Sequence, residues 1–410
     1  MAVVSAATKV TVRPLSSTHS VPHAMPACNR IDLPRMQVIN WFMSERPEHL
    51  YVQIDPHTFL AALDHCLDEN DLVCIRDRVA DLQAFISAAP FATAPDGDDL
   101  LGDELSLASR LILRRDVLSD ELQQVLDART LRRARYYLTR LQKGLTEVRT
   151  NAVNDINLNR WKEYDDILTD SLWLMDRRDN TGAHEAWYWG NFIPQIPHQL
   201  MLRYTKAGDW VLDPFAGSGT TLIECRRLGR NGLGIELNPE VAARSSAVIS
   251  EVPNPFGVTA EITVGDSGEV DFDALLSSYG VSRVQLVVLH PPYHDIIHFG
   301  DAPADLSNAP SVDAFIARFG DVVRKVRQVL EPGRFLAVVI GDKYEDGAWV
   351  PLGFYAMQAV MAKGLTLKSV VVKNLNGTRG KRDQQPLWRY RALVAGFYVF
   401  KHEYIFIFQS

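Results

Sequence analysis

The sequence is poor in several features by which common protein classes are known. Its four cysteines, Cys28, Cys66, Cys74 and Cys225, form no C-x-x-C pair, so neither a zinc site nor a disulfide framework is indicated. No apolar run approaches the roughly 20 residues of a membrane span, and the first residues lack the continuous apolar stretch of a signal peptide. We therefore expect free thiols, no metal, no membrane partner and a cytoplasmic location.

An excess of positive charge is absent as well. The 410 residues include 43 Lys and Arg against 50 Asp and Glu, for a net charge of −7. A chain of this charge binds a nucleic acid only if its cations gather on one face. With 47% hydrophobic residues, it has enough apolar mass for two domains, or for one domain with a large appendage.

Three regions differ in the spacing of their apolar residues. Residues 1–35 carry four prolines among Ser and Thr and predict an extended or disordered N-terminus. Residues 36–180 repeat apolar side chains three and four positions apart, which is typical of helices. In residues 181–410, short apolar strands alternate with helical segments, which predicts an α/β fold with a doubly wound, mostly parallel sheet. The expected strands are 210–212, 232–236, 261–264, 284–289, 334–340 and 367–373, followed by a hairpin-like pair at 394–400 and 403–408.

The helical segment 129–148 has a strongly basic face. Its leucines form one stripe at about 100° per residue. The opposite face carries five cations, Arg129, Arg132, Arg133, Arg140 and Lys143. A solvated amphipathic face is the simpler interpretation, and a phosphate-contacting helix is the alternative.

Residues 213–221 read Asp-Pro-Phe-Ala-Gly-Ser-Gly-Thr-Thr, between an apolar run and the start of a helix. Gly217 and Gly219 let the backbone approach a ligand, and the helix N-terminus beyond them offers free N–H groups. The block is not the dinucleotide G-x-G-x-x-G, and the lysine of a P-loop is missing. A strand, a glycine turn and a helix of this kind predict the mouth of a nucleotide-type cofactor site.

This block resembles motif I of the S-adenosylmethionine (SAM) methyltransferases that modify exocyclic amines of DNA bases. Its flanks fit too, because residues 191–198 read Asn-Phe-Ile-Pro-Gln-Ile-Pro-His and residues 234–240 read Gly-Ile-Glu-Leu-Asn-Pro-Glu. The resemblance covers roughly the last 220 residues. It implies a Rossmann-like methyltransferase domain, residues 181–410, with SAM as its cofactor.

The resemblance assigns cofactor contacts to the ends of three strands. Asp213 is expected to meet the positively charged methionine end of SAM, directly or through water. Glu236 is expected to accept hydrogen bonds from the ribose, and Asp266 to meet the adenine amine, with a simple turn residue as the alternative there. Asn191 and Phe192 resemble the segment that closes over the methionine part. The whole expected set is Asn191, Phe192, Asp213, Phe215, Ala216, Gly217, Gly219, Thr220, Thr221, Glu236, Leu237 and Asp266.

The fourth strand is followed by His290-Pro291-Pro292-Tyr293. It resembles the catalytic motif of amino-methyltransferases, usually Asp, Asn or Ser followed by Pro-Pro-Tyr. In that motif an acceptor side chain and the carbonyl of the first proline hold the target amine and steer its nitrogen toward the sulfonium methyl. The tyrosine presents a flat face to a flipped-out base.

His290 departs from this pattern. A neutral imidazole can accept a hydrogen bond from the amine, whereas a protonated one cannot. The departure puts the target base, the pH optimum and activity itself in question. The loop that follows, 294–308, is expected to close over the target nucleotide with His294, Asp295 or His298 in the pocket; a solvated loop is the alternative.

Five cations near the end of the chain are the expected nucleic-acid contacts, namely Arg379, Lys381, Arg382, Arg389 and Arg391. They lie among glycines and aromatics, which suits phosphate tracking, with a merely solvated loop as the alternative. Because little chain follows the catalytic motif, the helical region 36–180 is the expected target-recognition or partner module.

The resemblance implies a site-specific methyltransferase acting on double-stranded DNA. We slightly prefer N4 of cytosine over N6 of adenine, because the carboxylate or amide of the catalytic motif is missing. The alternatives are an RNA base-amine methyltransferase and a non-catalytic SAM-binding subunit of a larger complex. A homodimer, a restriction partner and the recognition sequence stay open.

Overall fold

The computed structural model describes residues 51–92, 111–185, 187–375 and 385–410. The N-terminal segment 1–35 and three of the expected nucleic-acid contacts, Arg379, Lys381 and Arg382, lie outside the described residues. Within the described ranges, no helix combines the length and the apolar character that crossing a membrane requires.

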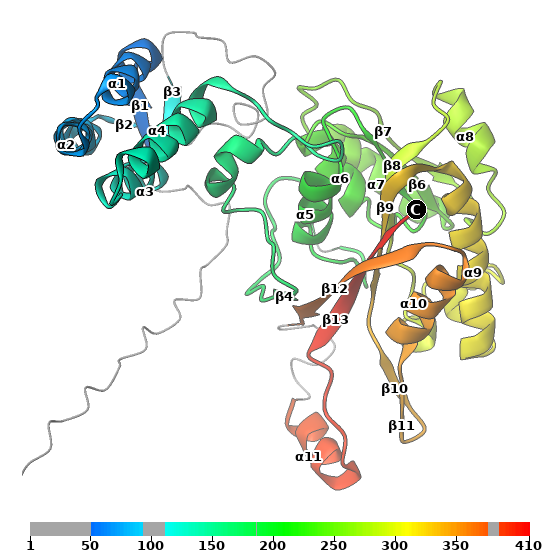
Figure 1. Cartoon of the computed structure of the whole chain (residues 1–410). Coiled ribbons are helices and arrows are strands. Elements are labelled where there is room, and N and C mark those ends of the chain that lie inside the picture. The colour runs from blue at the N-terminus through cyan, green and yellow to red at the C-terminus, as the bar shows by residue number, and fades with distance from the viewer. Residues whose placement is uncertain (1–50, 93–110, 186, 376–384) are drawn as a thin grey trace, which may run out of the picture. The chain divides into compact units, whose positions relative to one another are not determined.

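Residues 51–146 contain four helices and a small sheet with a core of their own (Figure 1). The helices are α1 (Pro56–Asp68), α2 (Leu72–Ala88), α3 (Arg115–Leu126) and α4 (Leu131–Thr146). The antiparallel sheet has the order β2 (Phe91–Ala92), β1 (Tyr51–Ile54), β3 (Leu111–Arg114). Asp55, Asp71 and Thr130 cap three of the helices by accepting hydrogen bonds from backbone N–H groups. The apolar stripes of all four helices then meet in one core with β1 and β3.

An eight-stranded sheet forms the centre of the remaining chain. Its order is β4 (Leu172–Trp173), β12 (Thr366–Asn374), β13 (His402–Gln409), β9 (Leu330–Ile340), β8 (Val284–Leu289), β5 (Trp210–Asp213), β6 (Asn231–Glu236), β7 (Ala260–Val264). β13 is antiparallel to both of its neighbours, and every other pair is parallel. The prediction of a mostly parallel sheet is confirmed.

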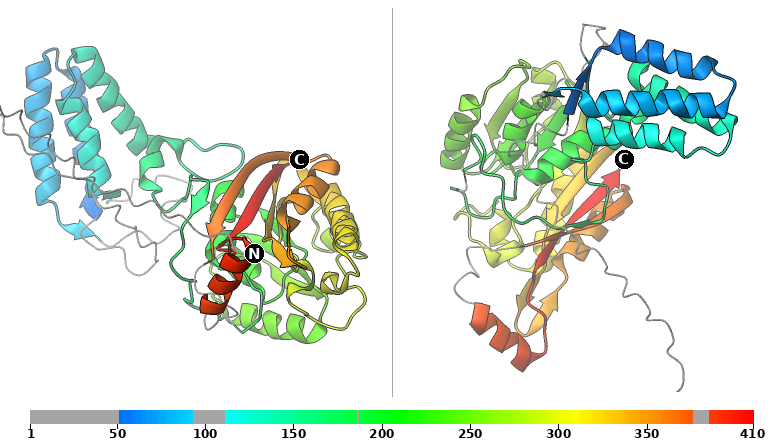
Figure 2. Two further views of the ribbon diagram at one scale, coloured as in Figure 1. Left: turned by 90° about the horizontal axis from the view of Figure 1, so that it is seen from below. Right: turned by 90° about the vertical axis from the view of Figure 1, so that its left-hand side faces the viewer.

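Helices cover both faces of this sheet (Figures 1 and 2). On one face α8 (Phe272–Ser278), α9 (Val312–Val329) and α10 (Leu352–Ala362) share a core with Val287 and Leu289 of β8. On the other face α5 (Gln195–Tyr204) shares a core with Leu286 and Val288. Next to α5, α6 (Thr220–Arg227) packs against α7 (Pro239–Glu251). Because side chains of a strand alternate in direction, this division of β8 confirms the doubly wound arrangement.

The order of the strands reverses between β5 and β8. The chain leaves β5 outward through β6 and β7, and then returns to β8 on the other side of β5. In open α/β sheets a crevice forms at the carboxyl ends of the strands that flank such a reversal. Asp213 ends β5 and His290 follows β8, so the topology brings the glycine block and the His-Pro-Pro-Tyr motif together.

The expected strand at 394–400 is wrong. The helix α11 (Gln385–Ala395) occupies the first part of that range, and the described residues after it form no strand until β13. Both edges of β13 are taken by β12 and β9, so the aromatic run has no strand to pair with. Phe397 stacks instead on Tyr344, with ring centroids 4.3 Å apart, and Phe400 packs against Trp349 at a tilt of 57°, with centroids 4.2 Å apart. These partners lie on the hairpin of β10 (Lys343–Glu345) and β11 (Ala348–Val350).

Gly234 gives a test of how tightly the glycine block packs on β6. A Cβ at Gly234 would lie 2.8 Å from the Ala216 side chain and 3.2 Å from that of Leu222. We expect Gly234→Ala to lower the free energy of unfolding by about 1–3 kcal/mol, as overpacking does. Gly300→Ala is the matched control, because its Cβ would meet only Asp305, at 3.8 Å. Urea denaturation of both variants measures the difference, and equal stabilities would contradict this packing.

Candidate functional site

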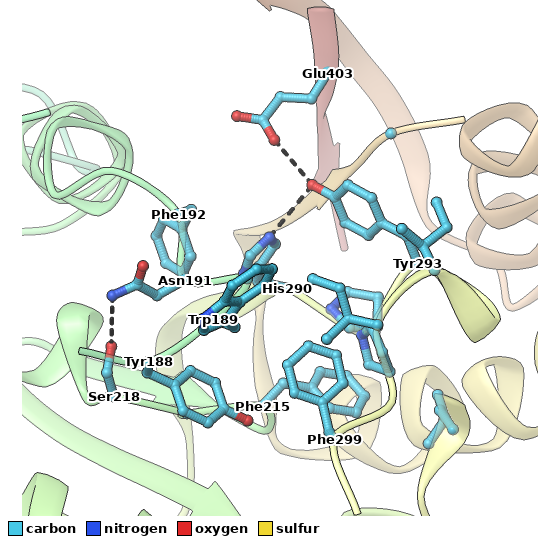
Figure 3. Close-up of a pocket in the computed structure, with 18 of the residues that line it drawn as sticks. Tyr188, Trp189, Asn191, Phe192, Phe215, Ser218, His290, Tyr293, Phe299 and Glu403 are labelled. Carbon is cyan, nitrogen blue, oxygen red and sulfur yellow. Dashed lines mark hydrogen bonds between the residues drawn. The ribbon is translucent and has the colours of Figure 1, made fainter. Parts of the chain in front are cut away.

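A cavity of about 1250 Å³ opens at the carboxyl ends of β5, β6 and β8 (Figure 3). All four residues of the His-Pro-Pro-Tyr motif line it. Nine residues of the expected cofactor set line it as well, namely Asn191, Phe192, Phe215, Ala216, Gly217, Thr220, Glu236, Leu237 and Asp266. Asp213, Gly219 and Thr221 do not reach its wall. One cavity therefore joins the two motifs.

The two positions, Gly217 and Gly219, require glycine for different local reasons. Both adopt the left-handed backbone conformation, with φ of 49° at Gly217 and 76° at Gly219, which favours glycine. A Cβ on Gly217 would lie 3.0 Å from the ring of Tyr188 at the cavity, whereas a Cβ on Gly219 would strike Ile249 of α7 at 2.7 Å. Gly217 thus lets the Tyr188 ring pack against the glycine turn, and Gly219 lets α6 approach α7.

Asp213 braces the glycine turn from behind. It is fully buried, and its carboxyl accepts hydrogen bonds from the Thr221 hydroxyl at 2.5 Å and the Phe215 N–H at 3.0 Å. Burial raises the pKa of Asp213 to about 6 against these two bonds, which lower it. The carboxyl therefore lies behind the cavity wall. The predicted contact of Asp213 with the methionine end of SAM would be indirect, through the glycine turn that Asp213 supports.

Glu236 ties the end of β6 to the same turn. Its two oxygens accept hydrogen bonds from the backbone N–H groups of Gly217 at 3.0 Å and Asn238 at 2.8 Å. Burial raises its pKa, opposed by these bonds. Each carboxylate oxygen still has a second lone pair, and the side chain faces the cavity. Asp266 lines the same wall, with one oxygen held by the Gly268 N–H at 2.8 Å.

Asn191 and Phe192 connect the two halves of the site. The Asn191 amide donates to the Ser218 hydroxyl of the glycine block at 3.1 Å. The ring of Phe192 stands edge-on to the imidazole of His290, with centroids 4.6 Å apart. Figure 3 shows both contacts on one side of the cavity.

His290 is held as a neutral imidazole. Burial lowers its pKa to about 4; the charge of Lys373 lowers it further and that of Glu403 raises it. Its Nε2 lies 3.3 Å from the Tyr293 hydroxyl, which donates to Glu403 at 2.9 Å. The Tyr293 ring also covers Gly341, where a Cβ would be only 3.0 Å away. A neutral ring at this place can accept a hydrogen bond near pH 7.

Two groups at the cavity were not foreseen from the sequence. Glu403 and Lys373 lie on β13 and β12, and no local pattern ties either of them to a motif more than 80 residues away. Tyr188, Trp189 and Phe299 form an aromatic cap over the glycine block (Figure 3), where Tyr188 and Phe299 stack with centroids 5.7 Å apart. The Trp-Tyr-Trp run just before Asn191 was the signal for this cap.

The loop after the motif contributes one of its three polar candidates. Asp295 lines the cavity and pairs with Lys343 at 2.6 Å. His294 is buried against the Ala309 carbonyl, and His298 bonds to Asp301 and Asn308 outside the cavity. Among the residues that the structure describes, no group of three or more His, Cys, Asp or Glu could hold a metal ion.

The cations that the sequence singled out, as far as the structure describes them, lie at α11 and at α4. Arg389 and Arg391 are exposed on α11, and the Arg391 guanidinium lies 5.2 Å from the ring centre of Trp388, which lines the cavity. On the basic face of α4, Arg140 pairs with Glu121. Its neighbours Arg129, Arg132 and Arg133 are exposed beside a shallow pocket.

Comparison with known proteins gives matches to a DNA methylase model and to type II methyltransferases. Residues 131–247 match the model of the N6/N4 DNA methylase family; the match ends before His290. The chain is 46% identical over 70 residues to the type II methyltransferase M.MjaII of Methanocaldococcus jannaschii, which is 16% of this chain and 13% of that protein. It is 40% identical over 87 residues to M2.DpnII of Streptococcus pneumoniae, which is 20% of this chain and 29% of that protein. These matches span less than a third of either relative.

Among solved structures, the chain is similar to TrmN from Thermus thermophilus. The similarity covers 54% of this chain and 50% of that one, at 15% sequence identity and a TM-score of 0.36. A similarity of this strength supports no conclusion about the site.

Thr221→Val tests whether Asp213 depends on its buried donor. Removing the hydroxyl leaves a buried carboxyl with one hydrogen bond fewer, which costs about 1–3 kcal/mol of stability. Because the pKa of Asp213 is raised to about 6 in the fold against about 3.9 when unfolded, protonation favours the fold at low pH, and this gain is lost as the pH rises through about 6.

The loss in Thr221→Val is therefore expected to be larger at about pH 8 than at about pH 5, where the carboxyl is mostly protonated. Urea unfolding at both pH values measures it. Thr221→Ser retains the hydroxyl and serves as the control. A loss independent of pH would show that the ionised carboxyl does not depend on this donor.

Proposed function

We propose that the chain transfers a methyl group from SAM to the exocyclic amine of a base in double-stranded DNA, because residues 131–247 match the model of the N6/N4 DNA methylase family. The observation that carries the proposal is the single cavity that joins the glycine block to the His-Pro-Pro-Tyr motif. The whole activity is a proposal, because the chain matches only short parts of its relatives.

The lining of the cavity offers groups that suit SAM. Gly217 has no Cβ between its backbone and the Tyr188 ring, so its backbone is bare where it lines the cavity. Glu236 keeps lone pairs free for the ribose hydroxyls, and Asp266 lies on the same wall for the adenine. Phe192, Phe215 and Leu237 supply apolar surface. We assign cofactor binding to the nine expected residues that line the cavity, with Asp213, Gly219 and Thr221 shaping the turn.

Within the site, the chain mainly positions the reacting nitrogen. SAM, when bound, would supply an electrophilic methyl group on a sulfonium sulfur that leaves as a neutral thioether, and the methylated nitrogen would lose one of its two protons to solvent. His290 and the carbonyl of Pro291 would accept hydrogen bonds from the two N–H groups of that amine, while Pro292 keeps the turn stiff. Tyr188, Trp189 and Phe299 line the cavity with apolar surface, which would help to exclude water.

The proposal also includes a choice of target base and of substrate. We favour N4 of cytosine over N6 of adenine, because an imidazole replaces the usual carboxylate or amide. An RNA substrate and a non-catalytic role remain the competing functions. The neutral state of His290 favours catalysis over the non-catalytic role, because the residue retains the acceptor that the reaction needs.

The deciding experiment is methyl transfer from labelled SAM to unmethylated plasmid DNA, followed by mass spectrometry of the nucleosides. We expect N4-methylcytosine in the digest. N6-methyladenine would correct the base and keep the activity. Absence of transfer to DNA, with SAM binding intact, would refute the proposed substrate, and transfer to RNA in the same assay would replace it.

The pH dependence of the reaction tests His290. Only the neutral ring can accept from the amine, and the neutral fraction falls as the pH drops below the pKa, which is about 4 here against about 6.5 for a free histidine. We expect kcat to hold from pH 8 down to about pH 5, and His290→Ala to lower it by about 100-fold.

His290→Asn is the control, because its amide oxygen accepts hydrogen bonds and does not titrate. It is expected to retain most of the transfer. A fall of kcat with a midpoint near 6.5 that disappears in His290→Asn would show that the ring is protonated more easily than its burial indicates.

Salt dependence tests the proposed DNA contacts on α11. Each phosphate contact adds about 0.9 to the slope of log binding constant against log salt concentration. Removing Arg389 and Arg391 together is therefore expected to lower the slope by up to about 2. The control is Arg283→Ala with Arg324→Ala, which removes the same charge from exposed ion pairs elsewhere. Equal slopes in both double variants would contradict contacts at α11.

A further inference from the structure

A buried ion pair lies behind the catalytic motif. Lys373 and Glu403 face each other across β12 and β13, with Nζ 2.9 Å from Oε1 and side chains only 5% and 7% exposed. A buried pair of this kind is stable only if further hydrogen bonds satisfy its oxygens. The Tyr293 hydroxyl provides one, at 2.9 Å from Oε2. Glu403 is therefore a carboxylate with one oxygen on a lysine and the other on a tyrosine.

The charge of Glu403 sets the direction of the next two hydrogen bonds (Figure 3). A carboxylate only accepts, so the hydroxyl proton of Tyr293 points to Glu403. The phenol oxygen is then an acceptor toward its other neighbour, Nε2 of His290 at 3.3 Å. That nitrogen can contribute to the contact only by donating, so it carries the proton of the neutral ring.

The second ring nitrogen is left free. A neutral imidazole has one N–H and one lone pair, so a proton on Nε2 places the lone pair on Nδ1. Within the described residues Nδ1 of His290 has no hydrogen-bond partner. It is also not one of the solvent-inaccessible side-chain atoms that are left without a partner. His290 also lines the cavity. An acceptor is thus available on the side of the ring away from Tyr293.

We propose that Glu403 is a positioning residue which, through the Tyr293 hydroxyl, holds His290 in the tautomer protonated at Nε2 and so leaves Nδ1 as the acceptor for the target amine. The identity of the amine rests on the proposed function, whereas the tautomer does not. An aspartate, asparagine or serine always presents an acceptor oxygen, but a histidine presents an acceptor at a given place in one tautomer only. Glu403 on β13 thus fixes the position of the acceptor, which a histidine in the motif does not fix by itself.

Nuclear magnetic resonance of the substrate-free protein labelled with ¹⁵N at histidine tests the tautomer. The signal of His290 is assigned by its absence in His290→Asn. We expect a protonated Nε2 and an unprotonated Nδ1 at neutral pH. Protonation at Nδ1 in the wild-type protein would overturn the proposal.

Glu403→Gln is expected to reverse the tautomer. Lys373 still requires an oxygen, so the amide turns its NH₂ group to Tyr293, and the Tyr293 proton then has only Nε2 of His290 to donate to. Adding Lys373→Met frees the amide to offer its oxygen to Tyr293, and this double variant is expected to return the proton to Nε2. An unchanged tautomer in Glu403→Gln would overturn the proposal.

Tyr293→Phe gives a second test that keeps both members of the ion pair, although Glu403 loses one hydrogen bond. It retains the ring and removes the hydroxyl, so His290 is expected to lose its single tautomer and to show averaged nitrogen shifts. Tyr404→Phe is the matched control. Its hydroxyl also donates to a carboxylate, Asp342 at 3.2 Å, but has no bond to His290, so the His290 signals are expected to stay unchanged. A single Nε2-protonated form in Tyr293→Phe would overturn the proposal.

Kinetics separate this inference from the proposed function. If the chain methylates a base, Glu403→Gln is expected to lower kcat by about 100-fold with the KM for SAM unchanged, and the double variant to recover most of it. If no base is methylated but the tautomer reverses in Glu403→Gln, the proposed function fails and Glu403 still controls His290. Normal kcat in Glu403→Gln with a reversed tautomer would overturn the role of Nδ1 as acceptor.

Discussion

The reversal of strand order between β5 and β8 is the constraint on which the site depends. Asp213 and His290 are 77 positions apart in the chain, yet the strands that carry them are neighbours and parallel. Their carboxyl ends therefore open into the same crevice. The glycine turn, the end of β6 and the His-Pro-Pro-Tyr motif face one cavity because of this topology, and neither motif could form such a cavity by itself.

Within that crevice, burial decides which charges are present. It raises the pKa of Asp213 to about 6 and lowers that of His290 to about 4, since desolvation disfavours the charged form of either group. Glu403 and Lys373 are buried together as a pair. The site thus holds a buried charged pair in contact with Tyr293 and presents the uncharged ring of His290 to the cavity. An uncharged acceptor suits the positioning of an amine next to a sulfonium group.

The strands that the sequence predicted well are those with strong local signals. The range 284–289 coincides with β8, and 210–212 differs from β5 by one residue. Both are apolar runs next to a recognisable motif, interrupted only by Gln285 in β8. The range 394–400 was predicted as a strand from its aromatic residues, but a strand needs a free edge, and β13 has none. The hairpin of β10 and β11 was missed, although Asp346 and Gly347 form its turn with φ of 49° and 80°, as Asp-Gly turns do.

The cofactor block and the catalytic motif could be read from the chain because each is a contiguous run whose spacing reflects local chemistry: two left-handed glycines, a helix start and two rigid prolines. Three facts about the same site could not. That Asp213 does not line the cavity, that His290 stays neutral, and that Glu403 joins Lys373 to Tyr293 all follow from desolvation and from contacts across strands far apart in sequence. Desolvation and contacts between distant strands depend on which surfaces the sheet buries, and no single stretch of sequence contains that information.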